Sequence, residues 1–187
     1  MKLKALIVSI KGIKLTKREK ILLREERPWG IILFKRNLKS FTQIKKLTNE
    51  IKIVTKNKNF PIIIDEEGEN VSRLRNLINH NISSNFFGLL YKKNKIFSLK
   101  IFKTYVSSLS IVLKDLGFNI NTIPVLDILK PYTNKIIDKR SFSKDKKIVK
   151  EMGNHTIKYL HSNKLAGIIK HIPGHGSAKS DSHKKMP

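Results

Sequence analysis

Residues 30–65 read GIILFKRNLKSFTQIKKLTNEIKIVTKNKNFPIIID, and this stretch decides the fold class. Its two ends, residues 30–34 and 60–65, are short apolar runs rich in isoleucine, which is typical of buried strands. Between them, from about Ser40, apolar residues recur at spacings of three and four, a pattern that predicts an amphipathic helix. These helical residues are Ile44, Leu47, Ile51 and Val54. A strand, a helix and a second strand in this order predict a βαβ unit with parallel strands.

The rest of the chain continues this alternation. Further apolar runs predict three more strands, at residues 5–10, 118–123 and 165–169. Helices are predicted between them, at residues 96–116, at residues 146–160, and after a capping box formed by Thr16 and Glu19. Five strands that alternate with helices predict a parallel α/β sheet, either open or part of a (β/α)₈ barrel.

Polar residues stand where the predicted strands end. Asp65 ends the third strand and Asp127 follows the fourth, while Lys170 and His171 end the fifth. In open α/β sheets and in (β/α)₈ barrels alike, the chemistry lies at the carboxyl ends of the strands. Packing in a core does not explain carboxylates and a lysine at these points. We therefore expect these side chains to share one cleft.

The segment after the fifth strand contains several histidines and charged residues. It reads KHIPGHG at residues 170–176 and DSH at residues 181–183. Pro173 and Gly174 exclude a regular helix between His171 and His175, so these histidines are not the helical pair of a zinc protease. The spacing is typical of a catalytic loop. The alternative is a glycine-rich surface turn in which the histidines have no function.

The composition of the chain narrows the classes of protein to which it can belong. The 187 residues suffice for one domain with a sizeable core, and the chain has no cysteine. The first 15 residues hold an apolar run too short for a secretion signal or a spanning helix, so we expect a cytoplasmic protein without a membrane partner. The net charge of +25 keeps nucleic-acid binding open as an alternative. However, lysines far outnumber arginines and are scattered, which does not favour a dedicated nucleic-acid interface.

Five motifs in the same order resemble the β-N-acetylglucosaminidases of glycoside hydrolase family three. Residues 170–183 resemble KHFPGHG…DSH, and residues 64–74, IDEEGENVSRL, resemble IDxEGGRVxRL. The other matching segments are GIILFKRN at 30–37, NTIPVLD at 121–127 and RSF at 140–142. The resemblance implies a (β/α)₈ barrel, of which residues 1–187 are the N-terminal part with about five βα units and no second domain.

The resemblance also implies an activity and its residues. It implies a retaining hydrolase that removes terminal β-linked N-acetylglucosamine from peptidoglycan fragments, acting as a monomer when complete and needing no metal or cofactor. His183 would be the acid/base, with Asp181 as its partner; histidine titrates near neutrality and suits this role. The residues implied to bind the sugar are Asp65, Arg73, Arg140, Lys170 and His171.

The chain departs from the family pattern at several points. Glu69 and Asn70 replace a glycine and an arginine, and Lys139 stands where a small residue is common. The family's nucleophilic aspartate is expected beyond residue 187, so the chain alone is expected to be inactive. An inactive relic that at most binds sugar remains an alternative. His175 is expected to shape its loop, and the other histidines to be structural or solvated; they are His80, His155 and His161.

Overall fold

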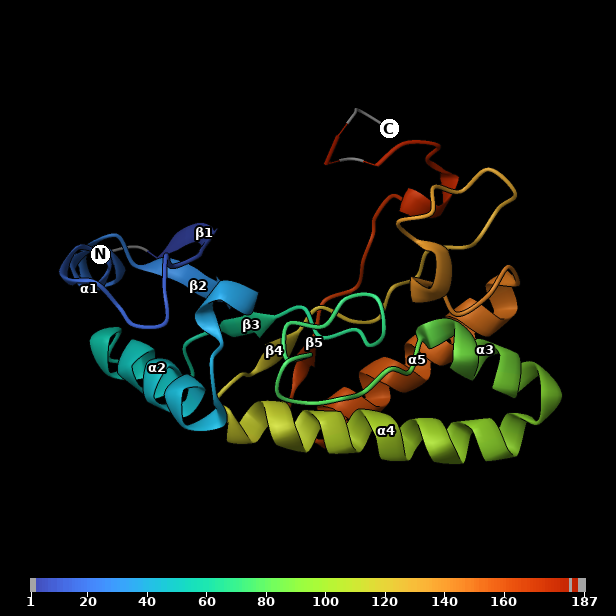
Figure 1. Cartoon of the computed structure of the whole chain (residues 1–187), viewed down its shortest axis with the longest axis horizontal. Helices are drawn as coiled ribbons and strands as arrows, with labels where there is room; N and C mark the ends of the chain where they lie inside the picture. Colours follow the sequence, from blue (N-terminus) through green and yellow to red (C-terminus); the bar gives the residue numbers. More distant parts are fainter. Residues whose placement is uncertain (1–2, 182, 185–187) are drawn as a thin grey trace.

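Five parallel strands form one sheet in the order β1-β2-β3-β4-β5 (Figure 1). The computed structural model describes residues 3–181, 183 and 184. The strands are β1 (Lys4–Val8), β2 (Pro28–Leu33), β3 (Ile62–Ile64), β4 (Ile120–Asn121) and β5 (Ala166–Gly167). Each strand pairs with its successor in the chain, as expected for consecutive βα units. The prediction of a parallel sheet is confirmed.

Helices connect the strands. They are α1 (Lys17–Glu25), α2 (Phe41–Val54), α3 (Ser84–Lys93), α4 (Lys95–Asp115) and α5 (Lys146–Ser162). Thr16 and Glu19 form the predicted capping box at α1, and the Ser40 side chain caps α2. In Figure 1, α2, α4 and α5 lie along the same side of the sheet. Three short 3-10 turns lie in the loops, at Lys35–Asn37, Asp138–Arg140 and His175–Ser177.

The core lies between the helices and the sheet. The apolar stripe of α2 predicted from its spacing is buried: Ile44 and Ile51 have no exposed surface, and Leu47 is 2% exposed. These residues belong to the same apolar cluster as Ile31 of β2 and Ile62 of β3. Each such side chain contributes about 1.5–3 kcal/mol when it is fully buried. The amphipathic pattern therefore fixes which face of α2 meets the sheet.

The last two strands are shorter than predicted. Pairing in β4 and β5 covers two residues each, against predicted strands at residues 118–123 and 165–169. After Asn121 and Gly167 the ladder is interrupted, and it resumes as a single bridge between Val125 and Lys170. The run at residues 118–123 is largely buried, whereas in the run at residues 165–169 only Leu165 is buried and Ile169 is 44% exposed. The interruption lies beside the site described below.

The sheet has two open edges within the described residues, because β1 and β5 each pair with one neighbour. Leu6 and Ile7 of β1 are 54% and 50% exposed, which is unusual for apolar side chains of a sheet. The described residues therefore do not close a barrel.

One helix, α4, is long and apolar enough to cross a membrane by length and composition alone. In the structure, part of its apolar surface faces the core, where Phe102, Val106 and Leu113 are at most 3% exposed. Of the apolar window, 33% is buried, and among the described residues the length and hydropathy of this helix are weak evidence for a membrane span, since a core helix passes the same test.

Candidate active site

A cavity of about 710 Å³ opens where the loops leave the carboxyl ends of β3 and β5. Its lining residues are Asp65, Glu67, Asn70, Val71, Arg73, Lys135, Ile136, Arg140, Lys170, His171, His175 and His183. Of the residues predicted for the site, two do not belong to this lining: Asp181, which contacts His183, and Asp127, which contacts His171. The expected convergence of side chains from distant strands is therefore present in the fold.

Asp65 joins three elements at the floor of the cavity. Its Oδ2 accepts a hydrogen bond from Arg73 Nη2 at 2.7 Å, and its Oδ1 accepts one from the Thr122 hydroxyl at 2.6 Å. Lys170 Nζ lies 3.5 Å from Oδ1. Burial alone would raise the pKa of Asp65, but the Thr122 hydrogen bond and the charges of Lys170 and Arg73 hold it below its usual value. Asp65 is therefore an ionised acceptor near neutral pH.

Glu67 is a second acid in the cavity that the sequence prediction missed. Its two oxygens accept hydrogen bonds from Nε and Nη2 of Arg140, at 2.8 and 3.0 Å, and Lys170 Nζ lies 2.5 Å away. Because alternate residues of extended chain point to the same side, its position two residues after Asp65 could have indicated a shared direction. Lys170 thus bridges both acids.

His171 is oriented by Asp127 behind it. His171 Nδ1 lies 2.5 Å from Asp127 Oδ2, and the Gly176 amide donates to Oδ1 at 2.9 Å. Burial would raise the pKa of Asp127, but these hydrogen bonds hold it below the usual value. The turn requires glycine at 176, since a Cβ there would lie 2.3 Å from the Ile128 carbonyl oxygen. Asp127 thus does not line the cavity but leaves His171 Nε2 facing it, 3.4 Å from Arg140 Nη2.

His183 and Asp181 form a contact at the rim. His183 Nδ1 lies 2.8 Å from Asp181 Oδ1, which also accepts from the His183 amide at 2.9 Å. These two hydrogen bonds lower the pKa of Asp181. The His183 side chain is 80% exposed. The contact between the predicted partners is present, while their catalytic role stays a prediction; Ser182 lies outside the described residues.

The other histidines differ in their surroundings. His175 lines the cavity, and its ring lies edge-on to that of His171 at 5.8 Å between centroids. His80 is largely buried, with Nε2 2.5 Å from Glu66 Oε1. His161 is exposed on α5. His80 therefore lies inside the fold, in contact with Glu66, and does not line the cavity.

Two departures from the family pattern contact each other. Lys139 Nζ donates to Glu69 Oε1 at 3.0 Å, and this hydrogen bond raises the pKa of Lys139. Gly68, just before, has φ of +133°, and a Cβ there would lie 2.3 Å from the Ile82 carbonyl oxygen. The loop therefore keeps the one glycine that it requires, and the new acid and base lie together beside Arg140.

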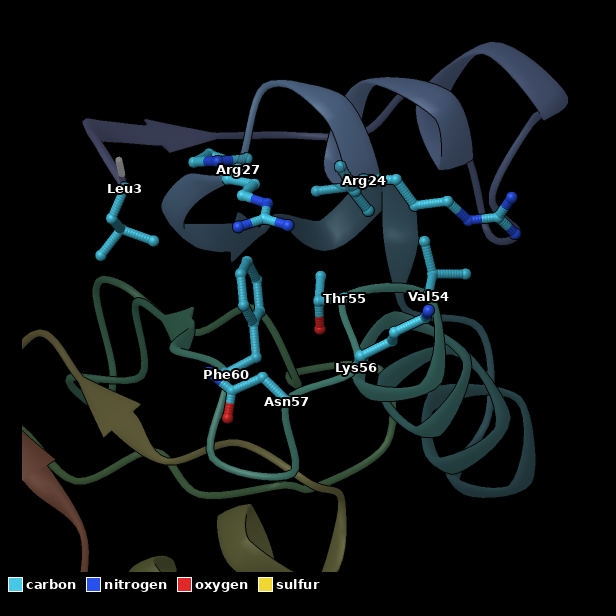
Figure 2. A pocket seen from close by; sticks show the side chains of 10 residues that line it. Leu3, Arg24, Arg27, Val54, Thr55, Lys56, Asn57 and Phe60 are labelled. Carbon is cyan, nitrogen blue, oxygen red and sulfur yellow. The ribbon is translucent and has the colours of Figure 1, made fainter. Parts of the chain in front are cut away.

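A second cavity, of about 470 Å³, lies near the amino ends of the strands (Figure 2). Figure 2 shows Arg27, which precedes β2, with its guanidinium group facing the Phe60 ring. None of the predicted site residues lines this cavity. In parallel α/β folds, residues at this end serve stability more often than chemistry.

No group of three acid or histidine side chains suited to a metal ion occurs among the residues that the structure describes. The acids of the cavity contact lysine, arginine or histidine instead, in the pairs described above. The arrangement is thus one of hydrogen-bond donors and acceptors around a polar ligand.

Comparison with known proteins finds one family along the whole chain. A family model described as the N-terminal domain of glycosyl hydrolase family 3 matches residues 1–187. A β-hexosaminidase from Thioalkalivibrio sulfidiphilus is 28% identical over 187 residues, which is 100% of this chain and 53% of that protein. One from Xanthomonas campestris pv. campestris is 28% identical over 178 residues, 95% of this chain and 53% of that protein. The chain thus spans about half the length of the curated relatives it matches.

Solved structures of similar proteins have the same fold as this chain. NagZ from Neisseria gonorrhoeae superposes with a TM-score of 0.90 at 29% identity, covering 99% of this chain and 54% of NagZ. That enzyme has also been solved in complex with N-trifluoroacetyl-D-glucosamine. A family 3 β-N-acetylglucosaminidase from a Paenibacillus strain gives 0.86 at 27% identity, covering 96% of this chain and 34% of that one. The parallel sheet with flanking helices therefore corresponds to part of the barrel predicted from the sequence.

Proposed function

The chain belongs to glycosyl hydrolase family 3, and from that premise we propose that its cavity binds a terminal β-linked N-acetylglucosamine and that the whole protein hydrolyses this linkage. The observation that carries the proposal is the convergence of Asp65, Arg73 and Lys170 at the carboxyl ends of the strands. The relatives named β-hexosaminidase, and the gonococcal enzyme solved with an N-acylated glucosamine, support the choice of sugar.

The charges of the cavity suit a neutral sugar. Asp65 is paired with Arg73, and Glu67 with Arg140, while Lys170 lies between the two acids. The acids can still accept hydrogen bonds from sugar hydroxyls, and the cations can still donate them. Because buried polar groups must be paired, a ligand rich in hydroxyls satisfies such a site better than an apolar one.

His183 is the proposed acid/base. Asp181 accepts from Nδ1, so Nε2 would carry the proton that passes to the leaving glycosidic oxygen and would later take one from water. A retaining mechanism also needs a carboxylate that forms the bond to the anomeric carbon. We assign this role to the part of the relatives' length that the chain does not span.

The source of the substrate and the cellular location of the enzyme are also proposals. We propose that the substrates are peptidoglycan fragments, as the resemblance implies, and that the enzyme works in the cytoplasm. The names of the relatives support a hexosaminidase and do not specify the source of its substrate. Release of N-acetylglucosamine from purified cell-wall fragments, compared with release from chitin oligomers, would test the preference.

Binding of N-acetylglucosamine to the chain tests the proposed site directly. In a titration followed by nuclear magnetic resonance, the shifted amides are expected around Asp65 and Lys170. Asp65→Asn should weaken binding by about tenfold or more, because it removes a charged acceptor. Asp115→Asn, a change in an exposed aspartate on α4, is the matched control. Equal affinities of the two variants would contradict the proposed site.

A further inference from the structure

Glu66 lies between the two acids of the cavity but does not line it. Its side chain is fully buried, and its Oε2 accepts hydrogen bonds from the amides of Arg73 and Leu74, at 2.8 and 2.9 Å. Its own backbone is held by Asn121, which donates to the Glu66 carbonyl at 2.8 Å and accepts from the Glu66 amide at 3.0 Å. Glu66 thus connects β4 to the segment that carries Arg73.

The remaining oxygen of Glu66 contacts His80. The distance between Glu66 Oε1 and His80 Nε2 is 2.5 Å, and His80 Nδ1 lies 3.2 Å from the hydroxyl of Tyr105 on α4. Burial, and then the charge of Glu66, raise the pKa of Tyr105, so its hydroxyl keeps its proton and is able to donate to Nδ1. With Tyr105 donating to Nδ1, the ring proton of His80 is on Nε2 and is donated to Glu66.

This chain of contacts reaches the proposed sugar site through Arg73. The Arg73 amide is held by Glu66, while its guanidinium group donates to Asp65 at 2.7 Å and lies 5.6 Å from the Phe34 ring centroid. Arg73 is only partly buried, so its long side chain depends on its backbone for a fixed position. A shift of the backbone at Arg73 would move the donor away from Asp65.

We propose that Glu66 and His80 are positioning residues that hold Arg73 against Asp65 for sugar binding. The proposal rests on the proposed function, since it deepens the role of the same site. The family pattern IDxEGG leaves the residue at position 66 open, so Glu66 is not one of the residues that define the motif. Neither residue touches the sugar in this proposal.

The test compares His80→Ala with His80→Gln in the 187-residue chain. Alanine removes the donor to Glu66, whereas the glutamine amide can donate from nearly the same place. We expect His80→Ala to speed hydrogen exchange of the Arg73 and Leu74 amides about tenfold or more, and to weaken N-acetylglucosamine binding by a similar factor. His80→Gln should restore most of both quantities, and His161→Ala on the exposed face of α5 should change neither.

Two outcomes would overturn the proposal. One is unchanged exchange at Arg73 and Leu74 in His80→Ala. The other is faster exchange throughout, including α2, which would mean that His80 serves global stability alone. If the wild-type chain does not bind the sugar, the proposed function fails, but exchange at Arg73 and Leu74 still decides whether His80 and Glu66 hold that backbone. The two failures are therefore distinguishable.

Discussion

Lys170 shows how single residues of this site depend on distant ones. Its ammonium group contacts Glu67 and Asp65 and also donates to the Thr122 hydroxyl at 2.8 Å. These partners come from the loops and strands around β3 and β4, so only the fold brings them together. An isolated buried charge is costly, whereas the three groups compensate one another. The site is therefore built as one network, in which Lys170 connects Asp65, Glu67 and Thr122.

The proposed acid/base yields a prediction at the residue scale. In a protein that also carries the family's nucleophilic carboxylate, His183→Ala should reduce hydrolysis by about 10²–10⁴-fold, the usual contribution of positioned proton transfer. The loss should be smaller for a substrate with a very acidic phenol as leaving group, which departs with little protonation. Asp181→Ala should cost less than His183→Ala, because it changes only orientation and charge. Steady-state kinetics on two aryl β-N-acetylglucosaminides would measure these losses.

His161→Ala serves as the control for that series, since His161 is exposed on α5. Losses of equal and small size for His183 and His161 would mean that His183 is only a loop residue. The same series tests the dependence on the leaving group. A purely structural effect of His183→Ala would reduce the rates of hydrolysis of both substrates by the same factor.

The positions of site residues could be predicted from the sequence where a motif and a strand end coincide. Asp65, Lys170 and His171 follow predicted strands, and parallel strands bring their carboxyl ends to one edge. Glu67 was missed because its role depends on Arg140 and Lys170, far away in the sequence. The contact between Glu69 and Lys139 could not be predicted either, although both were recognised as departures.

At the scale of elements, periodicity predicted α2 and missed α3. The α2 stripe is regular and wholly buried, so local pattern and tertiary packing agree. In α3 only Phe87 and Gly88 are buried, and a glycine inside a helix argues against that helix. The reason for Gly88 is tertiary, because a Cβ there would lie 1.8 Å from the Phe142 carbonyl oxygen. Sequence alone does not reveal such an approach.

The close packing of Gly88 of α3 against Phe142 can be tested by mutation. Gly88→Ala should lower the free energy of unfolding by about 1–3 kcal/mol, as expected for forced overpacking. In an isolated helix the same change would be favourable by about 1 kcal/mol, so the sign of the effect separates the two causes. Gly12→Ala, where no atom lies within 4 Å of the added Cβ, is the matched control. Urea unfolding of both variants would measure the difference, and a more stable Gly88→Ala would contradict the packing described here.

At the scale of the whole molecule, the site occupies one side of an open sheet. Its residues come from the loops after β3, β4 and β5, while β1 presents exposed Leu6 and Ile7 at the far edge. The gonococcal enzyme matches 99% of this chain with 54% of its own length. A saccharide bound in the cavity would therefore contact this chain on one of its sides. The part of the relatives that this chain does not match is available to contact the other side of the saccharide.

The chain by itself is expected not to turn over a chromogenic β-N-acetylglucosaminide. Retaining hydrolysis needs a free carboxylate at the anomeric carbon. Asp65, Glu67 and Asp127 do not meet this need, because each is already bound to lysine, arginine or histidine, and Asp127 does not line the cavity. The measurement is the rate of phenol release, with the gonococcal enzyme assayed in parallel. A comparable rate would show that a carboxylate of this chain acts as nucleophile. Isolation of the covalent intermediate, and identification of the residue that carries the sugar, would then show which one.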